Sequence, residues 1–117
     1  MGIRLIHVPT GRVLAERLEI ARSPVARMRG LIGRRNLPRG FGMFIGQCAS
    51  IHTFFMKFPI DVLFLSADLR VRKVVRHLPP WRLAGAWGAT HVVELAAGML
   101  DSLHVAAGDA VRLEETR

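Results

Sequence analysis

The residues most able to do chemistry interrupt one apolar block of the sequence: His52, Met56, Lys57 and Asp61. A histidine can exchange protons near neutral pH. An unpaired carboxylate beside an apolar run is costly, so Asp61 is expected to pair with Lys57 or an arginine, or to accept backbone hydrogen bonds at a strand entrance. The functional alternative is that the four side chains line a shallow ligand pocket.

Two further features are candidates for the rim of that pocket, and they contribute Arg29 and Trp81. Arg29 belongs to an arginine-rich segment around a helix that Pro24 begins: Arg22, Arg27, Arg29, Arg34, Arg35 and Arg39. Such a segment can receive a phosphate or carboxylate through bidentate bonds, or it can be a solvated helix face. Trp81, with Trp87, can stack on a sugar or base, anchor an interface, or cap the core.

Several common chemistries lack their sequence patterns. There is no Walker loop, GxGxxG turn, GxSxG elbow or HExxH helix. The single Cys48 excludes an internal disulfide and the Cys₂ and Cys₄ zinc patterns. Cys48, His52 and Met56 are ligand types for a soft metal ion, but their helical spacing in a strand-like segment would not bring them together. Asp61 and Glu94 could form a carboxylate pair for glycoside chemistry, but nothing in the sequence places them near one another. We therefore predict no metal and no cofactor, assign no catalytic residue, and leave open whether the chain is an enzyme.

The charge of the 117-residue chain is strongly positive, with 17 basic and 9 acidic residues and a formal net charge of +8. This raises the prior for an anionic partner. Nearly all the basic residues are arginine, however, which a GC-rich genome would also produce. The longest apolar stretch, Phe54 to Leu65, is broken by Lys57, Pro59 and Asp61, so we expect no membrane span. The start of the chain has no secretory pattern, and we expect a cytoplasmic protein.

The elements that must position these residues are mostly short strands. The expected strands are Ile3 to Val8 and Arg12 to Ile20 as a hairpin, then Met43 to Ile45, Ile51 to Phe58, Ile60 to Leu65, Arg70 to His77, His91 to Leu95 and Ala110 to Leu113. Short helices are expected from Pro24 to Gly33 and over Ala97 to Leu103, a loop over Leu78 to Gly88, and a frayed end over Glu114 to Arg117. In the expected strand that begins at Ile51, the side chains of His52, Phe54 and Met56 would share one face.

This pattern predicts a mainly β fold, of the β-rich α+β type, in one domain spanning residues 1–117. We expect a compact sandwich or barrel-like antiparallel sheet with one or two short helices.

The sequence also resembles a known family. The similar motifs are Arg29-Gly30-Leu31-Ile32-Gly33, Gly42-Met43-Phe44, the block from Ile51 to Leu65, Pro80-Trp81-Arg82, Val93 to Gly98 and Gly108-Asp109. In order and spacing they resemble the family called domain of unknown function 192. The resemblance implies a compact, mainly β domain and brings no established activity. The chain departs from the family at two places. One is Phe54-Phe55, and the other is Ala67-Asp68-Leu69, at which the family commonly has an Asp-Gly turn.

The function expected from these residues is a non-enzymatic module that binds a small ligand or a protein partner. The alternative is a basic nucleic-acid-associated protein that uses Arg27, Arg29, Arg34, Arg35 and Arg39. A third option, a small hydrolase, needs a pocket that holds two titratable groups within hydrogen-bond reach.

Overall fold

The structure is a computed structural model that describes residues 2–23 and 36–116, and this part of the chain is all-β. The strands are β1 (Gly2–His7), β2 (Arg12–Ala15), β3 (Arg17–Ala21), β4 (Phe41–Gly46), β5 (Ser50–His52), β6 (Ile60–Leu65), β7 (Val71–Leu78), β8 (Leu83–Gly85), β9 (His91–Ala96) and β10 (Val111–Thr116). The mainly β fold predicted from the sequence is confirmed.

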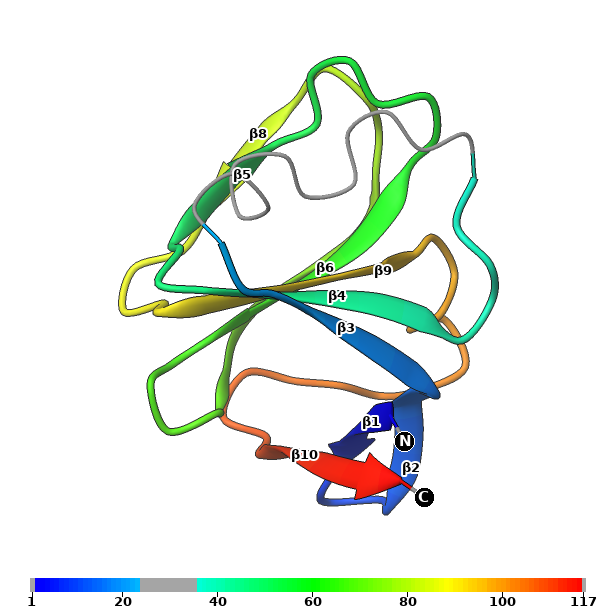
Figure 1. Ribbon diagram of the computed structural model, residues 1–117. Helices are drawn as coiled ribbons and strands as arrows, with labels where there is room; N and C mark the ends of the chain where they lie inside the picture. The colour runs from blue at the N-terminus through cyan, green and yellow to red at the C-terminus, as the bar shows by residue number, and fades with distance from the viewer. Residues whose placement is uncertain (1, 24–35, 117) are drawn as a thin grey trace.

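The strands form three layers (Figure 1). A five-stranded sheet in the order β3-β4-β9-β6-β7 lies in the middle, the sheet β10-β1-β2 lies below it, and the β5–β8 ribbon lies above it. The predicted β1–β2 hairpin is present, but the chain after Glu16 leaves it, and β3 joins the central sheet. There β3 pairs in parallel with β4, so the central sheet is mixed. A parallel pair needs a long connection, which residues 22–40 supply.

Successive side chains of the central strands point to opposite faces of the sheet, which divides the core into two. In β6, Leu63 and Leu65 point to the lower core, whereas Val62 and Phe64 point to the upper core beneath the β5–β8 ribbon. Both faces of the central sheet are therefore covered, which explains why β6 reads as a continuous apolar run rather than an alternating one.

Gly42 is required where β4 crosses the lower core. A Cβ atom at this position would lie 2.7 Å from a Leu95 methyl carbon and 3.2 Å from the Ala15 Cβ. A side chain here would therefore force the Leu95 side chain, or β4 itself, to shift within a packed core. This close approach accounts for the glycine in the Gly42-Met43-Phe44 motif.

The prediction of a strand over Ile51 to Phe58 is wrong after His52, where β5 ends. The Met56 N–H donates to the Thr53 carbonyl at 3.2 Å and closes a turn, and Phe55 has a left-handed φ of 65°. An apolar run of this length does not distinguish a strand from a packed turn. His52, Phe54 and Met56 therefore do not share a strand face.

Three further predictions differ from the structure. The loop over Leu78 to Gly88 contains strand β8, and β10 continues to Thr116 instead of fraying at Glu114. Ala97 to Leu103 forms successive turns rather than a helix, with bonds such as Asp101 N–H to the Gly98 carbonyl at 3.1 Å. The helix expected from Pro24 to Gly33 lies outside the described residues, and the described part has no helix that could cross a membrane.

Candidate functional site

Asp61 lies at the start of β6 and is completely buried. Its Oδ1 accepts a hydrogen bond from the His77 N–H at 2.9 Å, and its Oδ2 accepts one from the Leu100 N–H at 3.0 Å. A carboxylate with both oxygens bonded to backbone donors can remain buried at acceptable cost. Asp61 in β6 thus ties the turns after β9 to the end of β7, and it accepts backbone hydrogen bonds at a strand entrance, as one alternative from the sequence proposed.

The other residues of the sequence-predicted pocket lie in different places. Met56 is buried in the upper core, whereas His52 and Lys57 are exposed. Asp61 faces the lower core, because it pairs directly opposite Leu95. The structure therefore brings His52 and Lys57 to the surface above the central sheet and leaves Asp61 on its other face. Arg29 lies outside the described residues.

His52 instead joins a group of aromatic side chains at the upper end of the molecule. Its ring stacks on Phe54 with a centroid distance of 4.9 Å, and Phe54 stacks on Trp81 at 5.7 Å. Phe55 meets the Trp81 ring edge-on at 4.8 Å. Leu83 is the partner of His52 across the ribbon, so both lie on its outer face. We call this group, His52, Phe54, Phe55, Trp81 and Leu83, the aromatic patch.

The aromatic patch is exposed to an unusual degree for its composition. The exposed fractions are 66% for Phe55, 56% for Trp81 and 73% for Leu83. A contiguous group of large apolar side chains on the surface marks an interaction site more often than it marks packing. Sequence reasoning selected Trp81 and His52 but missed Phe54 and Phe55, because the assumed strand over Ile51 to Phe58 placed them in the core, and it missed Leu83 because no signal separated it from the rest of the loop over Leu78 to Gly88.

Thr53 holds the two loops of the aromatic patch together. It is fully buried, and its hydroxyl donates to the Pro79 carbonyl at 2.7 Å and accepts the Arg82 N–H at 2.9 Å. Its own N–H donates to the Arg82 carbonyl at 2.9 Å, and its carbonyl accepts the Trp81 N–H at 3.0 Å. These four bonds fix the loop of Phe54 and Phe55 against the loop of Trp81.

The two most exposed rings of the aromatic patch sit on left-handed backbone. Phe55 and Trp81 each have a φ of 65°, a conformation that costs about 1 kcal/mol or more for a residue with a side chain. The Thr53 bonds compensate for this strain. Backbone strain of this kind gathers at functional sites, so its presence under two exposed aromatic rings supports a role beyond packing.

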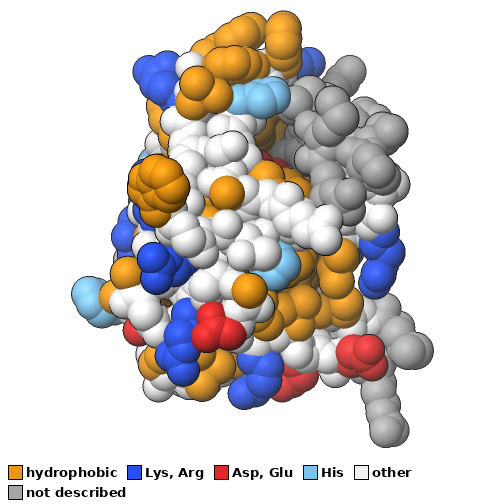
Figure 2. All heavy atoms as spheres, turned by 90° about the vertical axis from the view of Figure 1, so that its left-hand side faces the viewer, with side chains coloured by type: hydrophobic (Ala, Val, Ile, Leu, Met, Phe, Trp, Pro, Cys, Tyr) orange, Lys and Arg blue, Asp and Glu red, His pale blue; other side chains and the backbone are white. Residues whose placement is uncertain are grey.

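The two loops that form the aromatic patch carry basic side chains and no acidic ones. Lys57 and Arg82 are exposed in its two loops, and the sequence has no Asp or Glu in residues 20–60 or 69–93. Figure 2 shows hydrophobic side chains gathered at the upper end of this face, with basic and histidine side chains beside them, and most of the visible acidic side chains toward the lower end. The patch is therefore suited to a partner with apolar groups and negative charge.

Glu94 is a second buried carboxylate, in the middle of β9. It is 3% exposed, and its Oε1 has no hydrogen-bond partner among the described residues. Burial raises the pKa of Glu94 to about 7. Glu94 pairs opposite Val62, whose side chain points to the upper core. Asp61 and Glu94 thus leave opposite faces of the sheet, and they cannot act together on a glycosidic bond.

A hydroxyl, an imidazole and a carboxylate meet at the lower end of the molecule, an arrangement that the sequence did not suggest. His7 is buried, with Nδ1 2.8 Å from the Thr10 hydroxyl and Nε2 2.8 Å from Asp109 Oδ2. The pKa of Asp109 is lowered by the hydrogen bond from the Ala106 N–H and by the bond with His7. This group fastens the β1–β2 turn to the turn before β10, a structural role that explains the buried imidazole.

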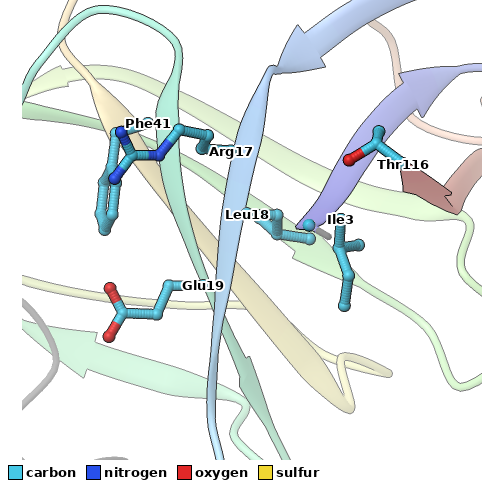
Figure 3. Close-up of a pocket in the computed structure, with 7 residues that line it drawn as sticks. Ile3, Arg17, Leu18, Glu19, Phe41 and Thr116 are labelled. Atoms are coloured by element: carbon cyan, nitrogen blue, oxygen red, sulfur yellow. The ribbon is translucent and has the colours of Figure 1, made fainter.

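The surface also has a hollow of about 390 Å³ beside the edge strand β3. Arg17, Glu19 and Phe41 lie on one side of β3, and Leu18, Ile3 and Thr116 lie on the other (Figure 3). None of the residues of the predicted pocket lines this hollow. Among the residues that the structure describes, no three His, Cys, Asp or Glu side chains gather as metal ligands would.

Comparison with known proteins decides the family. Residues 6–113 match the family DUF192, described as uncharacterized ACR. The chain belongs to the DUF192 family. A UPF0127 protein of Thermococcus sibiricus is 33% identical over 97% of this chain and 77% of its own length, and one of Pyrococcus furiosus is 31% identical over 97% and 98%.

Two crystal structures have the same fold as this DUF192 chain. A candidate transcription regulator from Sinorhizobium meliloti 1021 superimposes with a TM-score of 0.80 and 26% identity, covering 94% of this chain and 90% of its own. A protein of unknown function from Novosphingobium aromaticivorans superimposes with a TM-score of 0.78 and 25% identity, covering 94% and 82%. The resemblance to domain of unknown function 192 seen in the sequence is confirmed. Three residues of its motifs, Gly42, Asp61 and Asp109, have structural roles.

Proposed function

We propose that this DUF192 chain is a non-enzymatic binding module whose site is the aromatic patch. The observation that carries the proposal is the exposure of Phe55 and Trp81 on backbone that Thr53 holds in a strained conformation. Rings that are already fixed lose little conformational entropy when a partner covers them, so more of the burial energy contributes to affinity. His52 and Lys57 supply polar groups at the margin of the patch.

The form of the patch favours a partner larger than a small molecule. Small ligands bind in concave sites that enclose most of their surface, whereas Phe55, Trp81 and Leu83 stand on an exposed surface. A protein or a nucleic acid can cover such a surface without a pocket. The description of the Sinorhizobium meliloti relative as a candidate transcription regulator supports testing nucleic acid beside protein partners.

Replacing the rings by glycine tests the proposal without disturbing the fold. Glycine accepts a φ of 65° without strain. The free energies of unfolding of Phe55→Gly and Trp81→Gly should therefore lie within about 1 kcal/mol of that of the wild type. The two tryptophan indole N–H signals of the ¹⁵N-labelled protein, assigned with Trp87→Phe, report on ligand addition. Nucleosides, acidic peptides and anionic vesicles are suitable probes.

We expect at least one of these probes to shift the Trp81 indole signal, and Phe55→Gly to reduce that shift. Leu69→Gly, at another left-handed position with a φ of 62° in the β6–β7 turn, is the matched control and should leave it unchanged. Binding that shifts only signals of the hollow beside β3, or no binding by any probe, would contradict the proposal.

A further inference from the structure

The outer face of the β5–β8 ribbon links the aromatic patch to a second exposed ring. Trp81 precedes β8 and Trp87 follows it, and Trp87 is 96% exposed. Six residues of extended chain span at most about 20 Å. Between the two rings the outer face of the ribbon carries the paired residues His52 and Leu83 and, next along, Ser50 and Gly85. The ribbon thus presents aromatic rings at both ends of a short, open track.

Basic side chains border this track. The Arg72 Nε donates to the Trp87 carbonyl at 3.4 Å, and the Lys73 Nζ donates to the Gly85 carbonyl at 2.9 Å. Both side chains are therefore held at the margin of the ribbon, and each has N–H donors beyond the one used. Arg82 lies at the Trp81 end. No acidic residue occurs in residues 69–93, so a negatively charged polymer would meet no repulsion from this segment.

We propose that this face of the ribbon binds single-stranded nucleic acid, with bases stacked on the rings near Trp81 and on Trp87, and phosphates near Arg72, Lys73 and Arg82. The inference rests on the proposed function, since it names the partner of the aromatic patch. Single strands are bound without sequence preference by aromatic rings that receive bases and by cations that follow the backbone, over roughly 4–16 nucleotides. The track has both components.

The composition of the track favours a single strand over a duplex. Bases in a duplex are stacked on each other and do not present their faces to protein rings. Arg72, Lys73 and Arg82 can contact the phosphates of either form, so the exposed rings of Trp81 and Trp87 are the feature that favours the single strand.

The test is fluorescence anisotropy with the full chain and a labelled thymidylate oligomer of about 20 nucleotides. Salt is set at about 50 and 200 mM, because phosphate contacts release counterions and weaken with salt. We expect the oligomer to bind at low salt and a duplex of equal length to bind at least tenfold more weakly. Trp81→Gly and Trp87→Ala should each weaken oligomer binding at least about fivefold.

Matched variants separate stacking from charge. Arg82→Ala should weaken binding at each salt concentration and reduce the slope of affinity against salt by about one. Val8→Ala and Arg12→Ala remove an exposed apolar and an exposed basic side chain from the β1–β2 hairpin, at the lower end of the molecule. Both controls should bind the oligomer as the wild type does.

Several results would overturn the inference. One is the absence of oligomer binding at low salt, and another is binding that Trp81→Gly and Trp87→Ala leave unchanged, which would reflect net charge alone. Equal affinity for the duplex would also overturn it. Vesicles of phosphatidylcholine and phosphatidylserine, or an acidic peptide, that bind in a Trp81-dependent way while the oligomer does not would overturn the nucleic-acid assignment and leave the aromatic patch as a binding site.

Discussion

Glu94 should make the stability of this domain depend on pH in a direction opposite to that of a salt-bridged acid. Its pKa is raised from 4.5 to about 7 by burial, so the folded protein binds the proton more tightly than the unfolded chain. This contribution to stability is complete below pH 4.5 and is lost as the pH rises through about 7. At about 1.4 kcal/mol per pKa unit, the shift corresponds to about 3 kcal/mol.

Glu94→Gln isolates this effect because glutamine has nearly the same shape and cannot ionise. Urea unfolding of both proteins from pH 4 to 9 gives the free energies of unfolding as a function of pH. We expect the difference between them to be small near pH 4 and to reach about 3 kcal/mol, in favour of Glu94→Gln, above pH 8. Glu16→Gln, the same chemical change at an exposed position, controls for net charge. Parallel pH profiles of the wild type and Glu94→Gln would refute the reasoning.

Three other substitutions test the contacts that position the surface. Thr53→Val keeps the shape of the side chain but leaves the Pro79 carbonyl and the Arg82 N–H without their hydroxyl partner. Urea unfolding should therefore show a free energy of unfolding lower by about 1–3 kcal/mol. An unchanged midpoint would show that these hydrogen bonds do not hold the two loops together. Asp61→Asn turns an N–H₂ toward the N–H of either His77 or Leu100, and we expect a loss of about 2–4 kcal/mol by the same measurement, with full stability as the contrary result. Gly42→Ala places a methyl 2.7 Å from Leu95 and should lower the thermal midpoint, at a cost of about 1–3 kcal/mol; calorimetry that finds no decrease would show that Leu95 moves aside freely.

The strands of this fold could be predicted from local pattern, since β-branched and aromatic runs between turn residues coincide with β1, β4, β6, β7 and β9. The exception is informative. The run from Thr53 to Phe58 has strand composition, yet it forms a turn because Thr53 bonds to Pro79, Trp81 and Arg82. That contact lies far away in sequence, so no local pattern could reveal it, and the exposed rings were assigned to the core as a result.

The same limit applies to the buried polar residues. The sequence indicated that Asp61 needs backbone donors or a cation, but its donors are 16 and 39 residues away. His7 and Asp109 are separated by 102 residues, and their types alone suggest no partnership. Chemistry that depends on long-range pairing therefore appeared only with the folded chain, whereas Trp81 and His52 could be selected because exposed loop aromatics and titratable interruptions are local signals.

The pairing of β1 with β10 has a consequence for synthesis of the chain. Gly2 lies opposite Thr116 and His7 opposite Val111, so β1 leaves the ribosome long before its partner β10 and waits for it before the lower sheet can close. Until then the edge of β1 lacks its partner strand, and pairing between distant strands is slow to form. The central sheet and the β5–β8 ribbon are complete in the nascent chain before β10 appears. The aromatic patch can therefore exist before the lower sheet has closed.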